Sequence, residues 1–143
     1  MKIRITVLIM SFIIMAGCQD RWSVLISDCT NPSYPVFCIT RAINYCTPVG
    51  RGFSYLDFRE IDSHGKSKRL MWAIRPTKNI DITSLIYGEA PSGYVEEMEA
   101  VPLEVGVLYS IHGKVIFRIV EEDGGVAPEV FVDYGEFLKS RAK

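Results

Sequence analysis

The sequence predicts an all-β protein, a single antiparallel β-sandwich of seven or eight strands that follows an N-terminal signal peptide. Three observations lead to this prediction. Short apolar runs alternate with turn residues at intervals of about 8–12 residues. Residues 109–119 alternate between apolar and polar side chains, which is the period of a strand. No stretch of ten residues in the mature chain shows the period of a helix. With 143 residues, the chain has room for one core.

The N-terminal stretch has the layout of a secretory signal. Lys2 and Arg4 precede an apolar run of 12 residues, Ile5 to Ala16. This run is too short to cross the hydrocarbon core of a bilayer, which requires roughly 20 helical residues. We therefore expect residues 1–17 to be a signal peptide that is removed from the mature protein.

The signal ends in Met15-Ala16-Gly17-Cys18, which resembles a bacterial lipobox in which Met15 replaces the usual leucine. The resemblance implies that Cys18 is acylated. It also implies firm anchoring, because several acyl chains bind a membrane stably whereas a single chain binds it only marginally. Gln19 follows the cysteine, whereas aspartate there is the usual signal for retention in the inner membrane. We therefore expect a lipid anchor on the periplasmic face of the outer membrane. The alternative is an ordinary signal peptide with a chance cysteine.

The mature chain is mildly acidic. Removal of residues 1–17 leaves 126 residues with 14 basic and 17 acidic side chains, a net charge of about −3. This balance is not that of a nucleic-acid-binding protein. We expect residues 18–20 to be a lipidated tether, residues 21–136 to form the sandwich, and residues 137–143 to be a C-terminal tail. Within residues 135–143 we expect no more than one short helical turn.

Five strands are predicted in the first half of the mature chain, each bounded by Gly, Pro, Asn or Ser residues. Their ranges are 21–27, 36–41, 53–61, 69–75 and 82–87. In the second half, the period-two pattern of residues 109–119 indicates one long strand with Gly113 in its middle. A hairpin at residues 112–114 is the alternative, which we disfavour because the turn would have to preserve the alternation. Residues 121–125 then form a turn, and residues 126–134 form the last strand.

Tyr109 is a candidate structural residue. Leu103, Gly106, Tyr109 and Ile111 resemble the segment that enters the sixth strand of fibronectin type III and related immunoglobulin-like domains. In those domains a tyrosine packs at the corner of the sandwich and its hydroxyl bonds to backbone a few residues upstream. The resemblance implies the same role for Tyr109 and an immunoglobulin-like sandwich. The alternative is a plain strand tyrosine.

Three cysteines remain after lipidation of Cys18, and the exported compartment permits disulfides. They allow one internal bridge with three pairings. Cys38 lies in an apolar run, where a thiol behaves as a small buried hydrophobe. Cys29 and Cys46 lie in looser sequence, so we favour a Cys29–Cys46 bridge and a free Cys38.

The sequence lacks the motifs of an enzyme. His64 and His112 are the two histidines, and neither has the spacing of a metal ligand pair. No phosphate-binding loop, dinucleotide fingerprint or nucleophile elbow occurs. Asp57, Glu60 and Asp62 are expected to be a solvated rim rather than a catalytic carboxylate pair. We expect no enzyme activity, cofactor, metal, small-molecule substrate or nucleic acid.

Two acidic clusters lie in or beside predicted turns. They are Glu96, Glu97 and Glu99 in the first, and residues 121–123 in the second. Such clusters usually solvate a surface, but they also steer a basic partner and raise its association rate. Tyr87 and Tyr94 add rigid contact area near the first cluster. The candidate partner-binding residues are Tyr87, Tyr94, Glu96, Glu97 and Glu99.

Several segments resemble a family of small enterobacterial lipoproteins classed as type VI secretion immunity proteins. The resemblance rests on the signal with its lipobox, Cys38-Ile39-Thr40, the strand around Trp72, and residues 82–94 followed by 100–103. It implies a periplasmic lipoprotein that neutralises a secreted toxin by binding it. The acidic clusters make a basic toxin domain the candidate partner, and we expect membrane contact through the lipid anchor alone. The alternative function is a structural or assembly accessory lipoprotein of an envelope secretion or conjugation machine.

Overall fold

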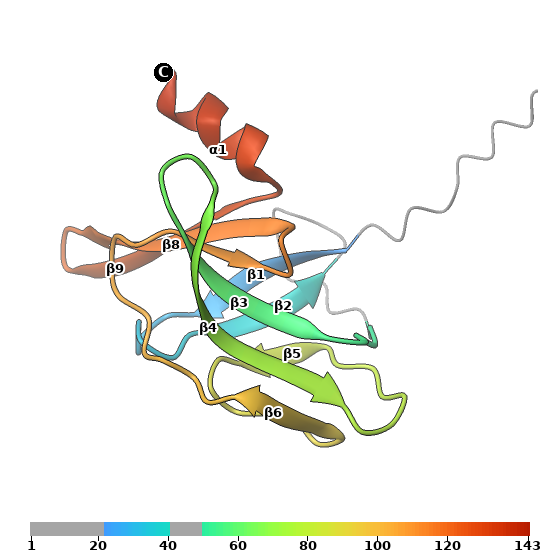
Figure 1. The fold of residues 1–143 in the computed structure, drawn as a ribbon. Helices are drawn as coiled ribbons and strands as arrows, with labels where there is room; N and C mark the ends of the chain where they lie inside the picture. The colour runs from blue at the N-terminus through green and yellow to red at the C-terminus, as the bar shows by residue number, and fades with distance from the viewer. Residues whose placement is uncertain (1–21, 41–49) are drawn as a thin grey trace, which may run out of the picture.

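A computed structural model describes residues 22–40 and 50–143. In these ranges the chain forms nine strands and one helix, and every strand pairing is antiparallel, which confirms the predicted all-β sandwich (Figure 1). The elements are β1 (Ser23–Asp28), β2 (Val36–Thr40), β3 (Leu56–Ile61), β4 (Ser67–Pro76), β5 (Ser84–Ile86), β6 (Tyr94–Met98), β7 (Tyr109–Ile111), β8 (Val115–Glu122), β9 (Gly125–Phe131) and α1 (Tyr134–Arg141).

The strands form two sheets of unequal size. The smaller sheet has the order β1-β2-β5, and the larger has the order β6-β4-β3-β7-β8-β9. An immunoglobulin constant-type domain divides its strands four and three instead. Both β6 and β9 are edges of the larger sheet, and β9 approaches β1 of the smaller one.

Aromatic side chains join the two sheets. Phe37 of β2 lies 5.4 Å from Phe58 of β3 and 5.2 Å from Phe117 of β8, measured between ring centroids. Phe58 also contacts Trp72 and Tyr87, at 5.4 and 5.2 Å. These five rings are at most 1% exposed. Each such contact contributes about 0.5–1.5 kcal/mol beyond the burial of apolar area, so this cluster is the centre of the core.

The predicted long strand over residues 109–119 is wrong, because the chain turns back at its middle. Ile111 pairs with Val115, so β7 and β8 form a hairpin with a three-residue loop. His112 and Gly113 have φ of 52° and 63°, and Lys114 N–H donates to Ile111 O at 3.0 Å. Paired residues in a hairpin point to the same face, and Ile111 and Val115 are four positions apart. The alternation therefore continues through the turn, and the period alone could not reveal it.

The strand β6 is absent from the predictions. Its sequence is Tyr-Val-Glu-Glu-Met, and glutamate is depleted in strands. As an edge strand, β6 pairs with β4 on one side and exposes its glutamates on the other. Exposed charges are common on edge strands, where they oppose pairing between molecules.

The segment expected as a C-terminal tail instead belongs to α1. Asp133 caps this helix by accepting from Glu136 N–H at 2.8 Å. Phe137 is 1% exposed and packs against Phe131 of β9. The cap and this buried ring stabilise a helix that is too short to show a clear period in the sequence.

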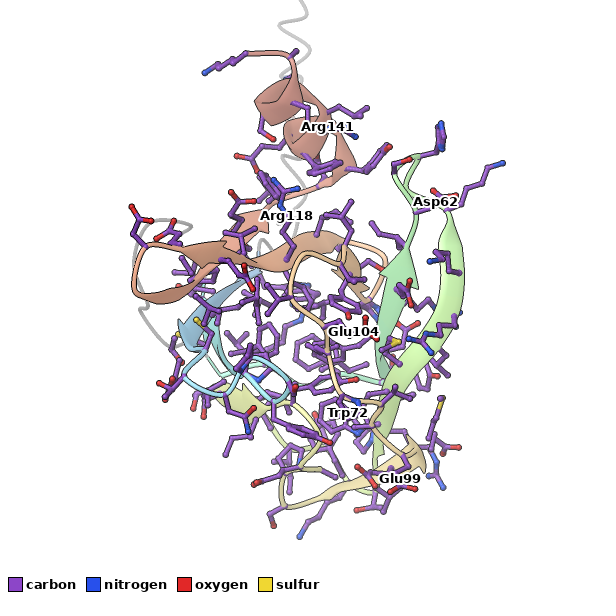
Figure 2. The ribbon with its side chains drawn as sticks, turned by 90° about the vertical axis from the view of Figure 1, so that its left-hand side faces the viewer. Asp62, Trp72, Glu99, Glu104, Arg118 and Arg141 are labelled. Carbon is purple, nitrogen blue, oxygen red and sulfur yellow. The ribbon has the colours of Figure 1, made fainter. Side chains whose placement is uncertain are left out.

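The side chains of Arg118 and Arg141 approach the ring of Phe137, each at 5.7 Å from the ring centroid (Figure 2). Tyr134 donates its hydroxyl hydrogen to Ser63 O in the loop between β3 and β4. The helix is therefore attached both to the larger sheet and to this loop.

Candidate functional site

Tyr87 lies in the core rather than at a binding surface. Its side chain is 0% exposed, and its hydroxyl lies 2.7 Å from Val101 O and 3.1 Å from Met71 O. Burial raises the pKa of this hydroxyl well above its usual value. The prediction that Tyr87 contacts a partner is therefore wrong, because the loop after β5 turns its ring inward against Trp72.

Tyr94 is also structural. It is 6% exposed, its hydroxyl donates to Ile80 O at 2.9 Å, and the same oxygen accepts from Phe53 N–H at 3.2 Å. It thus fixes the loop between β4 and β5 to the segment before β3. Gly93 precedes it with φ of 83°, and a Cβ there would lie 2.3 Å from Ile80 Cδ1. The predicted partner contact at Tyr94 is wrong for the same reason as at Tyr87.

Tyr109 has the geometry predicted for a corner tyrosine. Its ring is 1% exposed, and its hydroxyl oxygen accepts from Glu104 N–H at 2.8 Å. Burial raises the pKa of the hydroxyl above its usual value. The hydrogen bond fixes the loop that enters β7, so Tyr109 belongs to the scaffold.

The three candidate glutamates differ in what they contact. Glu96 Oε1 accepts from Trp72 Nε1–H at 2.9 Å, and Glu97 forms an ion pair with Arg75 of β4. Glu99 follows β6 and is exposed at the bottom of the molecule in Figure 2. Glu96 is thus partly structural and Arg75 offsets the charge of Glu97, so Glu99 is the exposed carboxylate of the three without such a contact among the described residues.

The second acidic cluster forms the turn between β8 and β9. Glu121, Glu122 and Asp123 are all exposed there, and Gly124 has φ of 89°. In Figure 1 this turn lies on the left, whereas β6 lies at the bottom, and Figure 2 likewise shows Glu99 at the bottom, apart from the turn. The two acidic clusters are therefore separate patches.

A cluster of aromatic and basic side chains lies around Trp22, at the end of the fold opposite the β8–β9 turn (Figure 1). The guanidinium of Arg51 is 5.1 Å from the centroid of the Trp22 ring, and Lys114 Nζ is 4.7 Å from it. The rings of Phe53 and His112 lie 5.1 and 6.4 Å from Trp22. Burial and the nearby Arg51 charge lower the pKa of Lys114. We call these five residues the tether-end cluster, since Trp22 follows the predicted tether.

The tether-end cluster was missed by sequence reasoning. Its members come from the start of β1, the segment before β3 and the turn between β7 and β8. Only the folding of the sheets brings them together, and no spacing in the sequence marks them.

The carboxylates of β3, Asp57 and Glu60, form ion pairs within the fold. Asp57 accepts from Arg59 Nε at 2.6 Å, and its other oxygen lies 3.7 Å from His112 Nδ1. Glu60 is 8% exposed and pairs with Lys68 and Arg69, whose hydrogen bonds lower the pKa of its carboxyl. The expected solvated rim is therefore wrong for Glu60.

Asp62, by contrast, is partly exposed in the loop. It accepts from Lys66 N–H and His64 N–H, which lower its pKa. This carboxylate stabilises its own turn.

The cysteine prediction is also wrong. Cys29 is a free thiol whose Sγ lies 3.9 Å from Val126 O of β9, and burial raises its pKa. Cys38, expected to be free, is disulfide-bonded. In the ladder between β1 and β2, Asp28 pairs with Val36 at one end and Ser23 pairs with Thr40 at the other. Cys29 follows the first of these ends, whereas Cys38 is two residues before Thr40 at the second. Cys18 and Cys46 lie outside the described residues.

An open hollow of about 380 Å³ lies between residues 52–54 and 76–80. Its lining includes Ser54, Thr77 and Asn79, and Lys78 is its titratable residue. A lone amine without a neighbouring acid or base in that lining does not form an acid–base pair.

Among residues 22–40 and 50–143, no group of three or more His, Cys, Asp and Glu side chains is placed to hold a metal ion. In the same ranges no helix is long and apolar enough to cross a bilayer.

The fold and its surface define a two-sheet β protein with two acidic patches and a basic, aromatic end. Comparison of the chain with protein-family models, with curated protein sequences and with solved structures found no match.

Proposed function

We propose that this protein is a lipid-anchored periplasmic protein that binds a protein partner and, in this way, neutralises a secreted toxin. The observation that carries the proposal is the exposed acidic edge formed by β6 and Glu99. It is supported by the lipobox-like sequence that ends at Cys18 and by the resemblance to immunity lipoproteins.

The acidic edge favours a basic partner. Like charges on β6 would meet if two copies of this strand paired, so self-association along the edge is disfavoured. A partner surface rich in Lys and Arg would meet opposite charge, which raises the association rate and makes it dependent on salt. A basic toxin domain has this chemistry.

The position of the edge also suits a tethered binder. Tyr94, at the start of β6, reaches Phe53 of the tether-end cluster through its hydroxyl. Glu99 lies five residues further along, about 16 Å away at the rise of a strand. The end of β6 that carries Glu99 therefore points away from the first described residue, Trp22, and from the membrane to which a lipidated Cys18 would attach the chain.

A matched pair of charge reversals tests this proposal. Glu99→Lys should slow association with the partner by roughly threefold or more, and the defect should shrink as salt rises. Glu104→Lys makes the same change of charge on another part of the surface (Figure 2) and should leave binding unchanged. Binding is measured by surface plasmon resonance against the protein captured by the tagged, full-length chain from envelope extract.

The identity of the captured protein separates the two functions. A toxin whose activity in the periplasm is suppressed by this chain supports immunity. A resident component of a secretion or conjugation machine supports the assembly role. Equal binding by Glu99→Lys, Glu104→Lys and the parent would show that the acidic edge only solvates the surface.

A further inference from the structure

The tether fixes where Trp22 can lie relative to the membrane. Trp22 is four residues after Cys18, and four extended residues span at most about 14 Å. If Cys18 is acylated, as the proposed function requires, Trp22 lies within that distance of the anchored residue. The surface around Trp22 is therefore within reach of the lipid headgroups.

Basic side chains are concentrated at this surface. The charged groups of Arg51 and Lys114 both lie over the ring of Trp22, which gathers two positive charges on one side chain. Both residues are partly exposed, so their charges can be reached from the surface. His112 is exposed in the adjoining turn, and Arg59 lies beside it through their shared contact with Asp57.

Among the described residues, the carboxylates that adjoin the cluster are Asp57 and Asp81. Asp57 is paired with Arg59, and Asp81 packs against Gly50 and Gly52, on either side of Arg51. Arg51, Arg59 and Lys114 carry three permanent charges, and His112 adds a fourth when it is protonated.

This local excess of positive charge is opposite in sign to the net charge of the whole mature chain, which is about −3. A face of average charge would be repelled by an anionic membrane, whereas this one would be attracted within a Debye length of about 8–10 Å.

The acidic turn between β8 and β9 lies far from this surface. β8 runs from Val115, next to Lys114, to Glu122, a distance of about 23 Å at the rise of a strand. In Figure 1, β1 and β3 begin on the right, where β7 turns into β8, and the acidic turn is on the left. With the tether-end cluster on the headgroups, the acidic groups face away from the membrane.

We propose that the tether-end cluster is a membrane-contacting surface, in which Arg51, Lys114 and His112 bind the phosphates of anionic lipid headgroups next to the anchor. This inference rests on the proposed lipid anchor and replaces the expectation that the acyl chains alone contact the membrane. Contact with the headgroups next to the anchor orients the domain and holds its acidic edge toward the periplasm.

The test measures the protection of individual lysines on vesicles. The protein is purified in detergent from cells that express the full sequence, and the mass of its Cys18 peptide is measured to establish acylation. It is then added to preformed vesicles of phosphatidylcholine alone or with phosphatidylglycerol. A water-soluble amine reagent modifies exposed lysines, and the extent at each lysine is read by peptide mass spectrometry.

We expect modification of Lys114 to fall at least threefold on phosphatidylglycerol vesicles relative to phosphatidylcholine vesicles, and to recover in high salt. Modification of Lys139, on α1, should be the same on both. Arg51→Gln should weaken the protection of Lys114, whereas Arg141→Gln, which removes an arginine that also contacts an aromatic ring, should not. If Arg51→Gln does not fold, Arg59→Gln replaces it.

The outcomes separate this inference from the proposed anchor. Acylated protein with equal Lys114 modification on both vesicles would overturn the membrane-contacting surface and leave the anchor intact. Protein without acylation that still shows protection of Lys114 on phosphatidylglycerol would overturn the anchor and support the surface. Protein without acylation and without protection would overturn both.

Discussion

The tether-end cluster and the acidic patches hold their charges in different ways. At the tether end, Arg51 and Lys114 lie on the ring of Trp22, and each charge is fixed by contact with an aromatic side chain. Away from this end, Glu99 and the turn between β8 and β9 project their carboxylates into solvent. Fixed charges suit a surface that meets one constant neighbour, whereas exposed charges act at a distance and steer a diffusing partner. This contrast supports our proposal that the tether end meets the membrane and the exposed carboxylates meet the partner.

Removal of the anchor should have the largest effect on this arrangement. Cys18→Ala prevents acylation, so nearly all of the protein should move from the membrane fraction to the soluble fraction. The tether-end cluster alone should not retain it, since a few surface charges give weak binding that salt disrupts. Fractionation of cells at moderate salt measures this. Membrane association equal to that of the parent would contradict the lipid anchor.

Loss of the corner hydrogen bond should have the next largest effect, because it removes the acceptor of a backbone N–H in the loop that enters β7. Tyr109→Phe leaves the Glu104 N–H without its acceptor, which should lower the free energy of unfolding by about 1–3 kcal/mol. Partner binding by the folded fraction should not change. Urea denaturation measures the loss. A change below about 0.5 kcal/mol would show that the hydroxyl has no structural role.

Two substitutions within the acidic edge should separate structure from steering. Glu96→Gln weakens the acceptor for the indole N–H of buried Trp72 and should cost about 1 kcal/mol. Glu99→Gln should change stability by less than about 0.5 kcal/mol, as is usual for exposed sites. Thermal unfolding of the two variants gives the comparison. Equal losses would mean that the Glu96 contact does not stabilise the fold.

The smallest stability effect is expected at Lys114. Burial and Arg51 lower the pKa of Lys114 in the folded protein, so the unfolded chain binds more protons between the two pKa values. The contribution of Lys114 to stability should therefore rise as pH increases from the lowered pKa of the folded protein to the usual pKa of about 10.4. Lys114→Gln should remove this rise and change stability near neutral pH by less than about 0.5 kcal/mol. Denaturation of both proteins at neutral and alkaline pH measures it, and a steeper pH dependence in the variant would contradict the assignment.

The parts predicted from the sequence are those that depend on local patterns. The all-β fold follows from short apolar runs between turn residues, and the corner geometry of Tyr109 follows from the segment before β7. The acidic groups were also visible, because the members of each cluster are neighbours in the sequence.

The parts that were missed depend on the path of the chain. The turn at His112 and Gly113 preserves the alternation, so the pattern of a hairpin and that of a long strand are the same. Tyr87 and Tyr94 lie in a polar, glycine-containing segment that suggests a surface loop, but the chain folds their rings inward. The tether-end cluster combines residues from three distant segments, which no local pattern could have placed together.

The most direct test of the comparison is site-specific photo-crosslinking in cells that also produce the partner. A benzophenone amino acid replaces Glu99 in one strain and Lys114 in another, and each strain is irradiated and analysed for covalent adducts of the anchored protein. The account predicts a protein adduct from position 99, and lipid adducts without a protein adduct from position 114. A protein adduct from position 114 together with none from position 99 would contradict it.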